Sequence, residues 1–351
     1  MQNIQTFLKT LISIPGLSGY ESSIRELIEK TWKPLTDELE VSRMGSLHAL
    51  KRGSGKAPRP KILIAAHMDA IGLMVTGIND GFLRLTNIGG LDARVLPGQP
   101  VLVHGRRNLP GVIVQPPAHL LPAEMRDGPV PLQYLLVDTG LKPRDVDRLV
   151  QIGDIISFAQ QPLELQGDTL AGHSLDNRVS VAALTFCLEE LQTRIHLWDV
   201  WAVANTQEET TGGGARTSAF QLHPELAVVI DTTWGRSPGV PDHKTFPIGK
   251  GPTLGWGPDV HSGLHKAFIE VADKMELPYA IEIMPSHSGT DAHVIQVTSE
   301  GIPCMTVLIP IRYMHTPVEV VSMVDIKRAG SLIAEFIAQL STDFMQHLSL
   351  D

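Results

Sequence analysis

The sequence predicts an α/β protein whose chain is interrupted by a β-rich insertion. Apolar runs of strand length alternate with helical patterns before residue 70 and again after residue 165, an order typical of α/β folds. Between these parts the apolar pieces are short and separated by glycine, asparagine, aspartate and proline. This change predicts that residues 1–70 and 165–351 form one domain and that residues 71–164 form another.

The first part begins with a helix, because Ile4, Phe7, Leu8 and Leu11 recur at helical spacing. After the turn P-G-L-S-G, the segment E-S-S-I-R-E-L-I-E-K predicts a second helix. The run K-I-L-I-A-A-H at 61–67 is short and apolar, with β-branched residues near its start. It predicts a buried strand.

The insertion contains several strand-like pieces, among them P-V-L-V-H-G and Y-L-L-V-D-T-G. Short strands at close spacing with turn residues between them predict a small all-β module. After residue 165 helices and strands alternate again. In chain order the sequence predicts a helix at 178–193, a strand at 198–206, a helix after the glycines at 212–214, strands at 226–230 and 304–309, and a helical segment at 322–344.

The composition excludes several functional classes. The 351 residues carry a formal net charge of -9, which argues against nucleic acid or an anionic membrane as the main partner. Two cysteines, both in apolar runs, exclude a disulfide framework. No stretch reaches the roughly 20 apolar residues of a membrane span, and the first residues lack the features of a signal peptide. We therefore expect a cytoplasmic protein.

Histidines and acidic residues, which can bind metals or transfer protons, follow several of the predicted strands. Open α/β sheets place their sites at the carboxyl ends of the strands, so these residues are expected at one edge. So many acidic side chains together need cations to neutralise them, and carboxylates with imidazoles are suitable ligands for zinc, cobalt or manganese. The residues are His67 and Asp69 after the first strand, Asp176 before a helix, Glu208 and Glu209, Asp231, and His315.

The adjacent pair Glu208 and Glu209 is unusual at the end of an apolar strand. Glutamate is a poor strand residue and costly to bury without a partner. Neighbouring residues of a strand point to opposite faces, so the two carboxylates are expected to have different roles.

These motifs together resemble those of the M42 family of metallo-aminopeptidases. The segments A-H-M-D-A-I-G, L-D-N-R, Q-E-E followed by G-A, V-I-D, G-T-D-A and R-Y-M-H-T-P occur in the order of that family. The resemblance runs from P-G-L-S-G-Y-E near residue 15 to the last helix. It implies a mixed sheet with helices on both faces, a small PDZ-like β-barrel insertion that forms dimers, and a homododecamer of six dimers around a hollow tetrahedron.

The resemblance also implies a role for each candidate residue in the removal of amino-terminal residues from peptides. Two divalent ions, with zinc expected first and cobalt or manganese as alternatives, would lower the pKa of a water and anchor the free amino group. Glu208 would be the general base, and Asp69 would orient the imidazole of His67. The implied metal ligands are Asp176 as the bridge, His67 and Asp231 on one ion, and Glu209 and His315 on the other.

Two departures from the family pattern leave the substrate preference open. Ala70 stands where the family commonly has glutamate, and E-E-T-T-G-G-G-A replaces E-E-V-G-L-R-G-A. Asp291 and His293 match a loop beside the family's site, but they also fit a turn that starts a helix, so neither is assigned as a ligand. Arg178 is expected to support Asp176 rather than to touch substrate.

Three other functions are compatible with parts of the pattern. A related di-metal amidohydrolase acting on N-acyl amino acids or other small amides would use the same ligands. A glycosidase would use a pair of carboxylates but would leave the histidines without a role. A scaffold protein that kept the fold would not need the full set of ligands and base.

Overall fold

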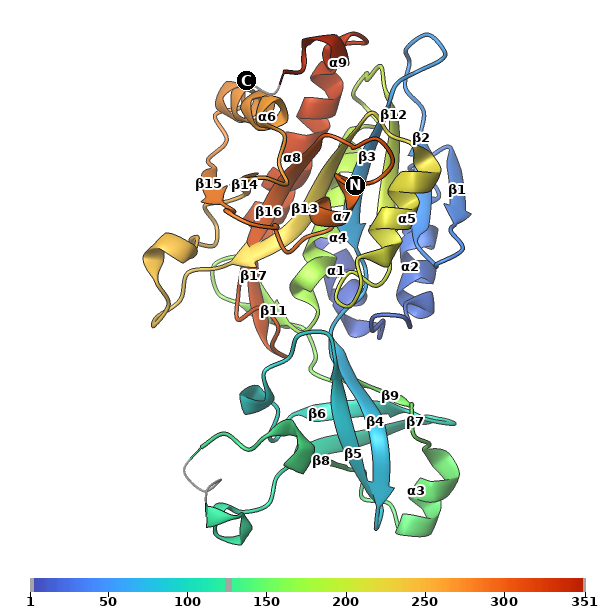
Figure 1. Cartoon of the computed structure of the whole chain (residues 1–351), viewed down its shortest axis with the longest axis vertical. Coiled ribbons are helices and arrows are strands. Elements are labelled where there is room, and N and C mark those ends of the chain that lie inside the picture. Colours follow the sequence, from blue (N-terminus) through green and yellow to red (C-terminus); the bar gives the residue numbers. More distant parts are fainter. Residues whose placement is uncertain (1–2, 124–127, 350–351) are drawn as a thin grey trace.

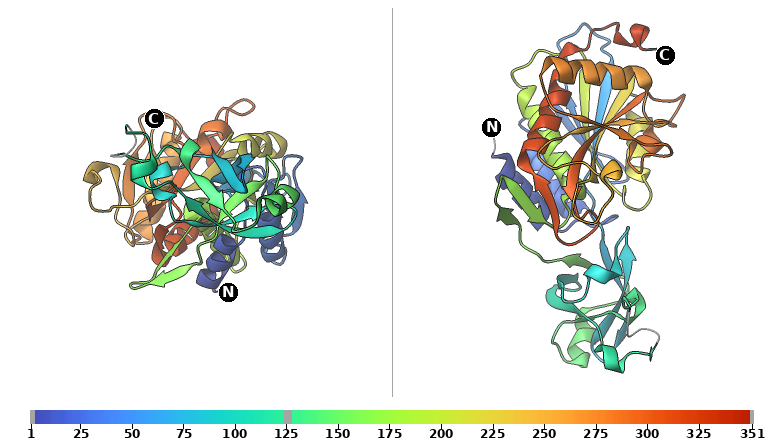
Figure 2. Two further views of the ribbon diagram at one scale, coloured as in Figure 1. Left: turned by 90° about the horizontal axis from the view of Figure 1, so that it is seen from below. Right: turned by 90° about the vertical axis from the view of Figure 1, so that its left-hand side faces the viewer.

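The computed structural model describes residues 3–123 and 128–349. The chain forms a larger α/β body and a smaller closed β-barrel (Figure 1). Figure 2 shows the barrel projecting from one end of the larger body. The predicted fold class, an α/β fold with a mixed sheet and a small β-barrel insertion, is confirmed.

The larger body contains an eleven-stranded sheet. Nine of its strands follow the order β1-β2-β12-β3-β13-β16-β17-β11-β10, and the other two, β14 and β15, join the sheet where β14 pairs with β16. The four neighbouring strands β12, β3, β13 and β16 are parallel, so their carboxyl ends lie at the same edge. The strands are β1 (Glu38–Val41), β2 (Leu47–Lys51), β3 (Lys61–His67), β10 (Leu163–Leu165), β11 (Thr169–Gly172), β12 (Asp199–Asn205), β13 (Leu226–Trp234), β14 (Thr253–Trp256), β15 (Ala280–Ile283), β16 (Cys304–Arg312) and β17 (Glu319–Ser322).

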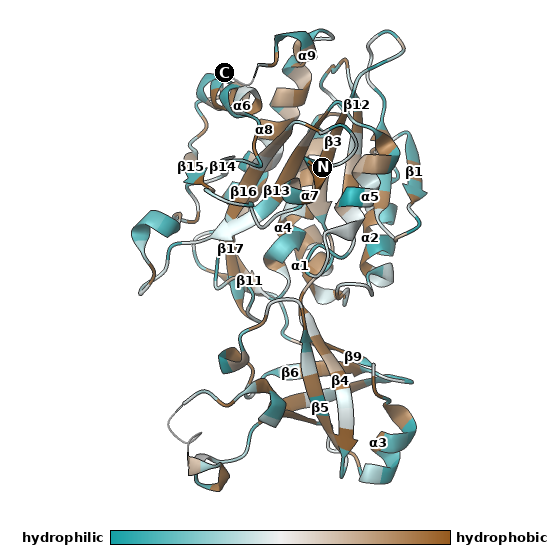
Figure 3. Ribbon diagram, viewed as in Figure 1, coloured by the Kyte–Doolittle hydropathy of each residue, from teal (hydrophilic) through white to brown (hydrophobic). Residues whose placement is uncertain are grey.

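Helices cover both faces of this sheet because the central strands are apolar on both sides (Figure 3). Ile62, Ile64 and Ala66 of β3 belong to one core, which is shared with α1, α2, α4, α6 and α8. Leu63 and Ala65 point the other way, toward α5 and α7. The helices are α1 (Ile4–Ser13), α2 (Ser22–Trp32), α4 (Leu175–Glu190), α5 (Gly213–Leu222), α6 (Ser262–Lys274), α7 (Ala292–Ile295), α8 (Met323–Gln339) and α9 (Phe344–His347), with a 3-10 turn η5 (Asp242–Lys244). In the described part of the chain, no helix combines the length and the apolar character that a bilayer crossing requires.

The barrel is built from six antiparallel strands in the order β4-β5-β8-β7-β6-β9. It has its own core, which includes Leu73, Leu83, Val103, Ile113 and Ile156. Its elements are β4 (Gly72–Asn79), β5 (Phe82–Ile88), η1 (Ala93–Val95), β6 (Pro100–His104), β7 (Asn108–Val114), η2 (Ala118–Leu120), η4 (Leu132–Tyr134), β8 (Leu136–Asp138), α3 (Pro143–Leu149) and β9 (Ile155–Phe158).

The predicted elements of the larger body are present, with bounds shifted by a few residues and three larger differences. The strand expected at 226–230 continues to Trp234, so Asp231 lies within it. The strand expected at 304–309 continues through Pro310 to Arg312, because its parallel pairing with β13 extends to Ile311. Pro310 removes only one backbone N–H donor from this pairing. The hairpin of β1 and β2 was not predicted, since β1 has only four residues, E-L-E-V, and is largely exposed. Cys187 and Cys304 are free and buried, as expected.

Candidate metal centre

The parallel strands bring three of the candidate residues to one edge of the sheet. His67 is the last residue of β3 and lies opposite Asn205, the last residue of β12. Asp231 lies on β13, two residues beyond the pairing of Val229 with Ala65. His315 follows the end of β16 by three residues. The expectation that strand ends assemble the site is therefore met for His67 and His315, whereas Asp231 lies within β13, which continues to Trp234.

Glu208 and Glu209 lie in a turn rather than on the strand, so the expectation that the strand would point them to opposite faces is wrong. Gln207 has a left-handed backbone conformation with φ of 58°, so the chain leaves the direction of β12 at this residue and enters the turn. The buried carboxylate of Asp69 then accepts hydrogen bonds from the backbone N–H of Glu208 at 3.0 Å and of Glu209 at 3.1 Å. Both glutamate side chains consequently reach the same site.

Asp176 is held at the start of α4 by a residue that the sequence reasoning missed. Its backbone is not helical, with φ of -76° and ψ of 108°. The buried carboxylate of Glu319 accepts from the N–H of Asp176 at 3.1 Å and from the N–H of His315 at 2.9 Å. The signal was available, because Glu319 is a glutamate in the apolar strand E-V-V-S, where an acid needs a partner.

The side chains form two adjoining groups that share Asp176. In the first group, Nε2 of His67 lies 3.4 Å from Oδ1 of Asp176 and 3.7 Å from Oδ1 of Asp231. In the second, Nε2 of His315 lies 3.4 Å from Oδ2 of Asp176 and 3.7 Å from Oε2 of Glu209. Ligands bound at about 2.0–2.2 Å in a tetrahedron lie about 3.3–3.6 Å apart. The spacing in both groups thus suits a divalent cation.

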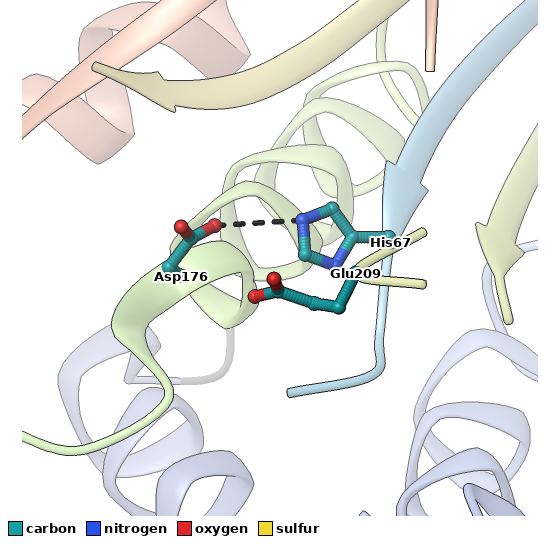
Figure 4. A group of neighbouring side chains, drawn as sticks. All are labelled: His67, Asp176 and Glu209. Atoms are coloured by element: carbon teal, nitrogen blue, oxygen red, sulfur yellow. Dashed lines mark ion pairs between the residues drawn. The ribbon is translucent and has the colours of Figure 1, made fainter. Parts of the chain in front are cut away.

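Figure 4 shows the side chains of His67, Asp176 and Glu209 converging from three different segments. Their ligand atoms all lie within 4.8 Å of one another. The two groups are therefore parts of one cluster. Oε2 of Glu208 lies 3.6 Å from Nε2 of His67, so the second glutamate borders the cluster as well.

The buried acids strongly favour an added positive charge. Burial raises the pKa of Glu208 and Glu209 well above the usual value, and neighbouring carboxylates raise it further against the opposing effect of His67. Burial lowers the pKa of His67, but the surrounding carboxylates, led by Glu208, outweigh it and hold that pKa well above its usual value. Oε1 of Glu209 is buried and has no hydrogen-bond partner. These donor types and this unpaired oxygen fit a bound cation.

His67 is oriented mainly by the backbone of Asp69. Its Nδ1 lies 3.2 Å from the carbonyl oxygen of Asp69 and 3.4 Å from the carboxylate of the same residue. An N–H at Nδ1 that donates to this carbonyl leaves Nε2 with a free lone pair. The predicted contact between the Asp69 carboxylate and the imidazole is present, although the carbonyl is nearer.

Arg178, Asp291 and His293 make contacts with residues outside the two groups. Arg178 donates to the carbonyls of Leu11, Ile14 and Gly16, so it ties α4 to the end of α1. Asp291 is buried and accepts a hydrogen bond from Nδ2 of Asn205 at 2.9 Å; burial raises its pKa to about 7. His293 is half exposed and lies 3.7 Å from Asp259.

A pocket of about 390 Å³ opens onto the cluster. One wall comes from the barrel side of the chain, where Gly89 and Gly90 follow β5. A Cβ on Gly89 would lie 3.4 Å from the Cβ of Glu209, and one on Gly90 would lie 3.0 Å from Nδ1 of His315. The lining residues are His67, Gly90, Asp176, Glu208, Glu209, Asp231, Thr232, Thr233, Trp234, Glu282, Met284, Ser288, Gly289, Thr290, Met314 and His315.

Comparison with known proteins agrees with this geometry. The profile of the M42 glutamyl aminopeptidase family matches residues 45–332. The chain is 34% identical to the lysyl aminopeptidase of Pyrococcus furiosus, over 95% of this chain and 96% of the relative. Its fold is similar to that of aminopeptidase APDkam598 from Desulfurococcus kamchatkensis, with a TM-score of 0.91 and 32% identity over 99% of this chain and 97% of the other.

A further similar structure is the TET1 peptidase of Pyrococcus horikoshii, described as assembling into a tetrahedron or a large octahedral shell. It has a TM-score of 0.83 and 30% identity over 96% of this chain and 100% of the other. Because the family profile covers most of the chain and these relatives match it almost end to end, the chain belongs to the M42 glutamyl aminopeptidase family and is an aminopeptidase.

Proposed function

We propose that this aminopeptidase removes amino-terminal residues from peptides with two divalent cations held by the five ligands predicted above. The observation that carries the proposal is the arrangement of Asp176, whose Oδ1 lies near His67 and whose Oδ2 lies near His315. Two separate oxygens directed at two separate groups suit a carboxylate that bridges two ions.

In this proposal the first ion would be held by His67, Asp176 and Asp231, and the second by Asp176, Glu209 and His315. Zinc fits both sets of nitrogen and oxygen ligands, and cobalt or manganese would be accepted as well. When bound, the two ions supply Lewis acidity and lower the pKa of a water.

Glu208 is proposed as the general base. Its carboxylate lines the pocket, lies 3.6 Å from Nε2 of His67 and is not among the five proposed ligands. Burial raises its pKa, so the carboxylate has a higher affinity for a proton than an exposed glutamate. Oε2 accepts the proton of the attacking water and then delivers it to the leaving amine.

A free amino terminus has a pKa of about 8, so its lone pair is available near neutral pH, and a cation held by the cluster would anchor it. Such anchoring explains why cleavage is expected at the first peptide bond. The pocket volume of about 390 Å³ is near the lower end for small-molecule sites. It suits the end of a peptide.

The proposal is tested by metal content together with activity. Protein treated with a chelator is expected to lose hydrolysis of aminoacyl p-nitroanilides and to regain it on addition of zinc, cobalt or manganese. Elemental analysis of the reloaded protein is expected to give two ions per chain. Full activity in the chelated protein, or saturation at one ion, would exclude the two-ion site.

We further propose that residues 71–164 form the dimerisation domain and that six dimers form a dodecamer in the cytoplasm. The proposal is supported by the closed barrel, which carries a core of its own, and by the tetrahedral assembly of the similar TET1 peptidase. Light scattering is expected to give twelve times the chain mass of 38.3 kDa. A stable monomer would exclude this assembly without affecting the proposed chemistry.

A further inference from the structure

The pocket carries one acidic side chain that the proposed mechanism does not use. Glu282 lies on β15 and lines the pocket. Apart from the five proposed ligands and Glu208, it is the only charged residue among the described lining residues. Glu282 is therefore available to bind a part of the substrate other than the scissile peptide bond.

Glu282 is fixed in place by two threonine side chains. Oγ1 of Thr233 donates to its Oε1 at 2.8 Å, and Oγ1 of Thr253 donates to its Oε2 at 2.9 Å. Each carboxylate oxygen still has a lone pair free to accept. Thr233 follows Asp231 by two residues on β13, which places it about 6–7 Å farther along the strand. That distance is close to the length of an extended lysine side chain.

The carboxylate has no cationic partner in the pocket. No lysine or arginine is found among the described lining residues, and Asp231 is close enough to raise the pKa of Glu282 in addition to the larger effect of burial. A cationic side chain from a ligand would offset both effects. Trp234, whose exposed fraction is 52%, and Met284 offer apolar surface to the methylene groups of such a side chain.

We propose that Glu282 selects peptides whose amino-terminal residue has a cationic side chain, lysine or arginine. The proposal rests on the proposed function, because it assumes that the free amino group binds at the candidate metal centre. The side chain of the same residue then extends along β13, and its ammonium or guanidinium group pairs with the carboxylate of Glu282. An amino-terminal glutamate would instead face a like charge.

The first test needs no variant. Norleucine has the same four side-chain carbons as lysine but lacks the terminal ammonium group, so comparison of the lysine and norleucine p-nitroanilides isolates the effect of the charge. The metal-loaded enzyme is expected to show a kcat/KM for lysine about 10–100-fold higher than for norleucine, the range of a charge-assisted contact, and the lowest value for glutamate. A ratio near one, or a preference for glutamate, would overturn the proposal.

The second test assigns the preference to this side chain. In Glu282→Gln the ratio of lysine to norleucine is expected to fall toward one, and in Glu282→Lys the glutamate substrate should become better than the lysine substrate. Glu270→Gln, an exposed acid on α6, should keep the wild-type ratio. An unchanged ratio in Glu282→Gln, or an equal loss on all substrates, would show that Glu282 does not select.

Binding of products gives a readout that does not depend on turnover. Free lysine is expected to inhibit the wild-type enzyme at a lower concentration than free norleucine, and Glu282→Gln should remove that difference. If none of the aminoacyl substrates is hydrolysed by the metal-loaded enzyme, the proposed function fails. If norleucine is hydrolysed without any advantage for lysine, only the selectivity proposal fails.

Discussion

At the scale of single residues, the site depends on carboxylates that hold backbone groups as much as on those that face the pocket. Asp69 accepts from the N–H of Glu208 and of Glu209, and Glu319 accepts from the N–H of Asp176 and of His315. Two buried acids thus fix the backbone of four residues at the candidate metal centre. Such contacts restrict ligand geometry before any cation binds.

Glu208→Gln is expected to lower kcat by about 10²–10⁴-fold, because a neutral amide cannot accept the proton of the attacking water. The substitution keeps the size of the side chain and all five proposed ligands. Elemental analysis should therefore still find the wild-type metal content. Activity within tenfold of the wild type would exclude Glu208 as the general base.

Asp69→Asn is expected to weaken the site through the backbone. The asparagine side chain has one acceptor oxygen, so one of the two glutamate N–H groups would face an amide donor. An unsatisfied buried donor lowers the free energy of unfolding by about 1–3 kcal/mol. Loss of a hydrogen bond that supports a metal ligand lowers metal affinity about 10–100-fold. Thermal unfolding and competition with a chelator measure the two effects. Asp80→Asn, at an exposed position, serves as the control and should change neither.

At the scale of elements, the segment after β5 connects the barrel to the candidate metal centre. Gly89 has φ of 75°, a conformation that other residues rarely adopt. Gly90 faces His315, and an added Cβ would approach its Nδ1 to 3.0 Å. This distance is tighter than an ordinary contact, so the imidazole would have to move.

Gly90→Ala is therefore expected to lower metal affinity about tenfold, the smaller end of the range for residues that support ligands, and to lower kcat/KM with it. Gly128→Ala is the matched control, because a Cβ there meets open space. Chelator competition on both variants gives the comparison. Equal affinities in the two variants would mean that His315 accommodates the methyl group or does not bind the ion.

At the scale of the whole molecule, the buried acids make the stability of the metal-free protein depend on pH. Burial raises the pKa of Glu208, Glu209 and Glu319, and that of Asp291 to about 7. The folded protein then keeps protons that the unfolded chain has released above its ordinary carboxyl pKa of about 4. Fewer protons are bound after unfolding, so the free energy of unfolding falls as pH rises through this range.

We therefore expect the Tm of chelator-treated protein to be several degrees lower at pH 8 than at pH 5. Bound cations replace these protons, so protein reloaded with zinc should lose most of this dependence and gain more stability at pH 8 than at pH 5. Calorimetry at both pH values, with and without zinc, measures the effect. A higher Tm at pH 8 in the metal-free protein would contradict it.

Much of the fold could be predicted because the elements of the larger body carry clear patterns. The helix with Ile4, Phe7, Leu8 and Leu11 forms as predicted, with all four side chains buried. The apolar strand at 61–67 is buried on both faces, which follows from its lack of polar alternation. The insertion was recognisable by its turn residues, although the closure of its six strands into a barrel depends on pairings that no local pattern encodes.

The site was less predictable where long-range hydrogen bonds determine it. The turn at Glu208 and Glu209 depends on Asp69, which lies far away in the sequence, so strand alternation gave the wrong expectation. An acid in the apolar strand E-V-V-S indicates that Glu319 needs a partner, but only the contacts of Glu319 and Glu282 in the folded chain reveal what they support. The assignment of ligands to particular ions stays a prediction.

The glycine pair after β5 also limits how far this protein could be shortened. A designer who excised the insertion and joined the ends of the larger body would remove Gly89 and Gly90 along with the strands, although both border the candidate metal centre. A trimmed chain of this kind would expose His315 and Glu209 to bulk water on that side. A minimal version of the enzyme would have to retain Gly89 and Gly90, or replace them with a segment that has no larger side chains beside Glu209 and His315.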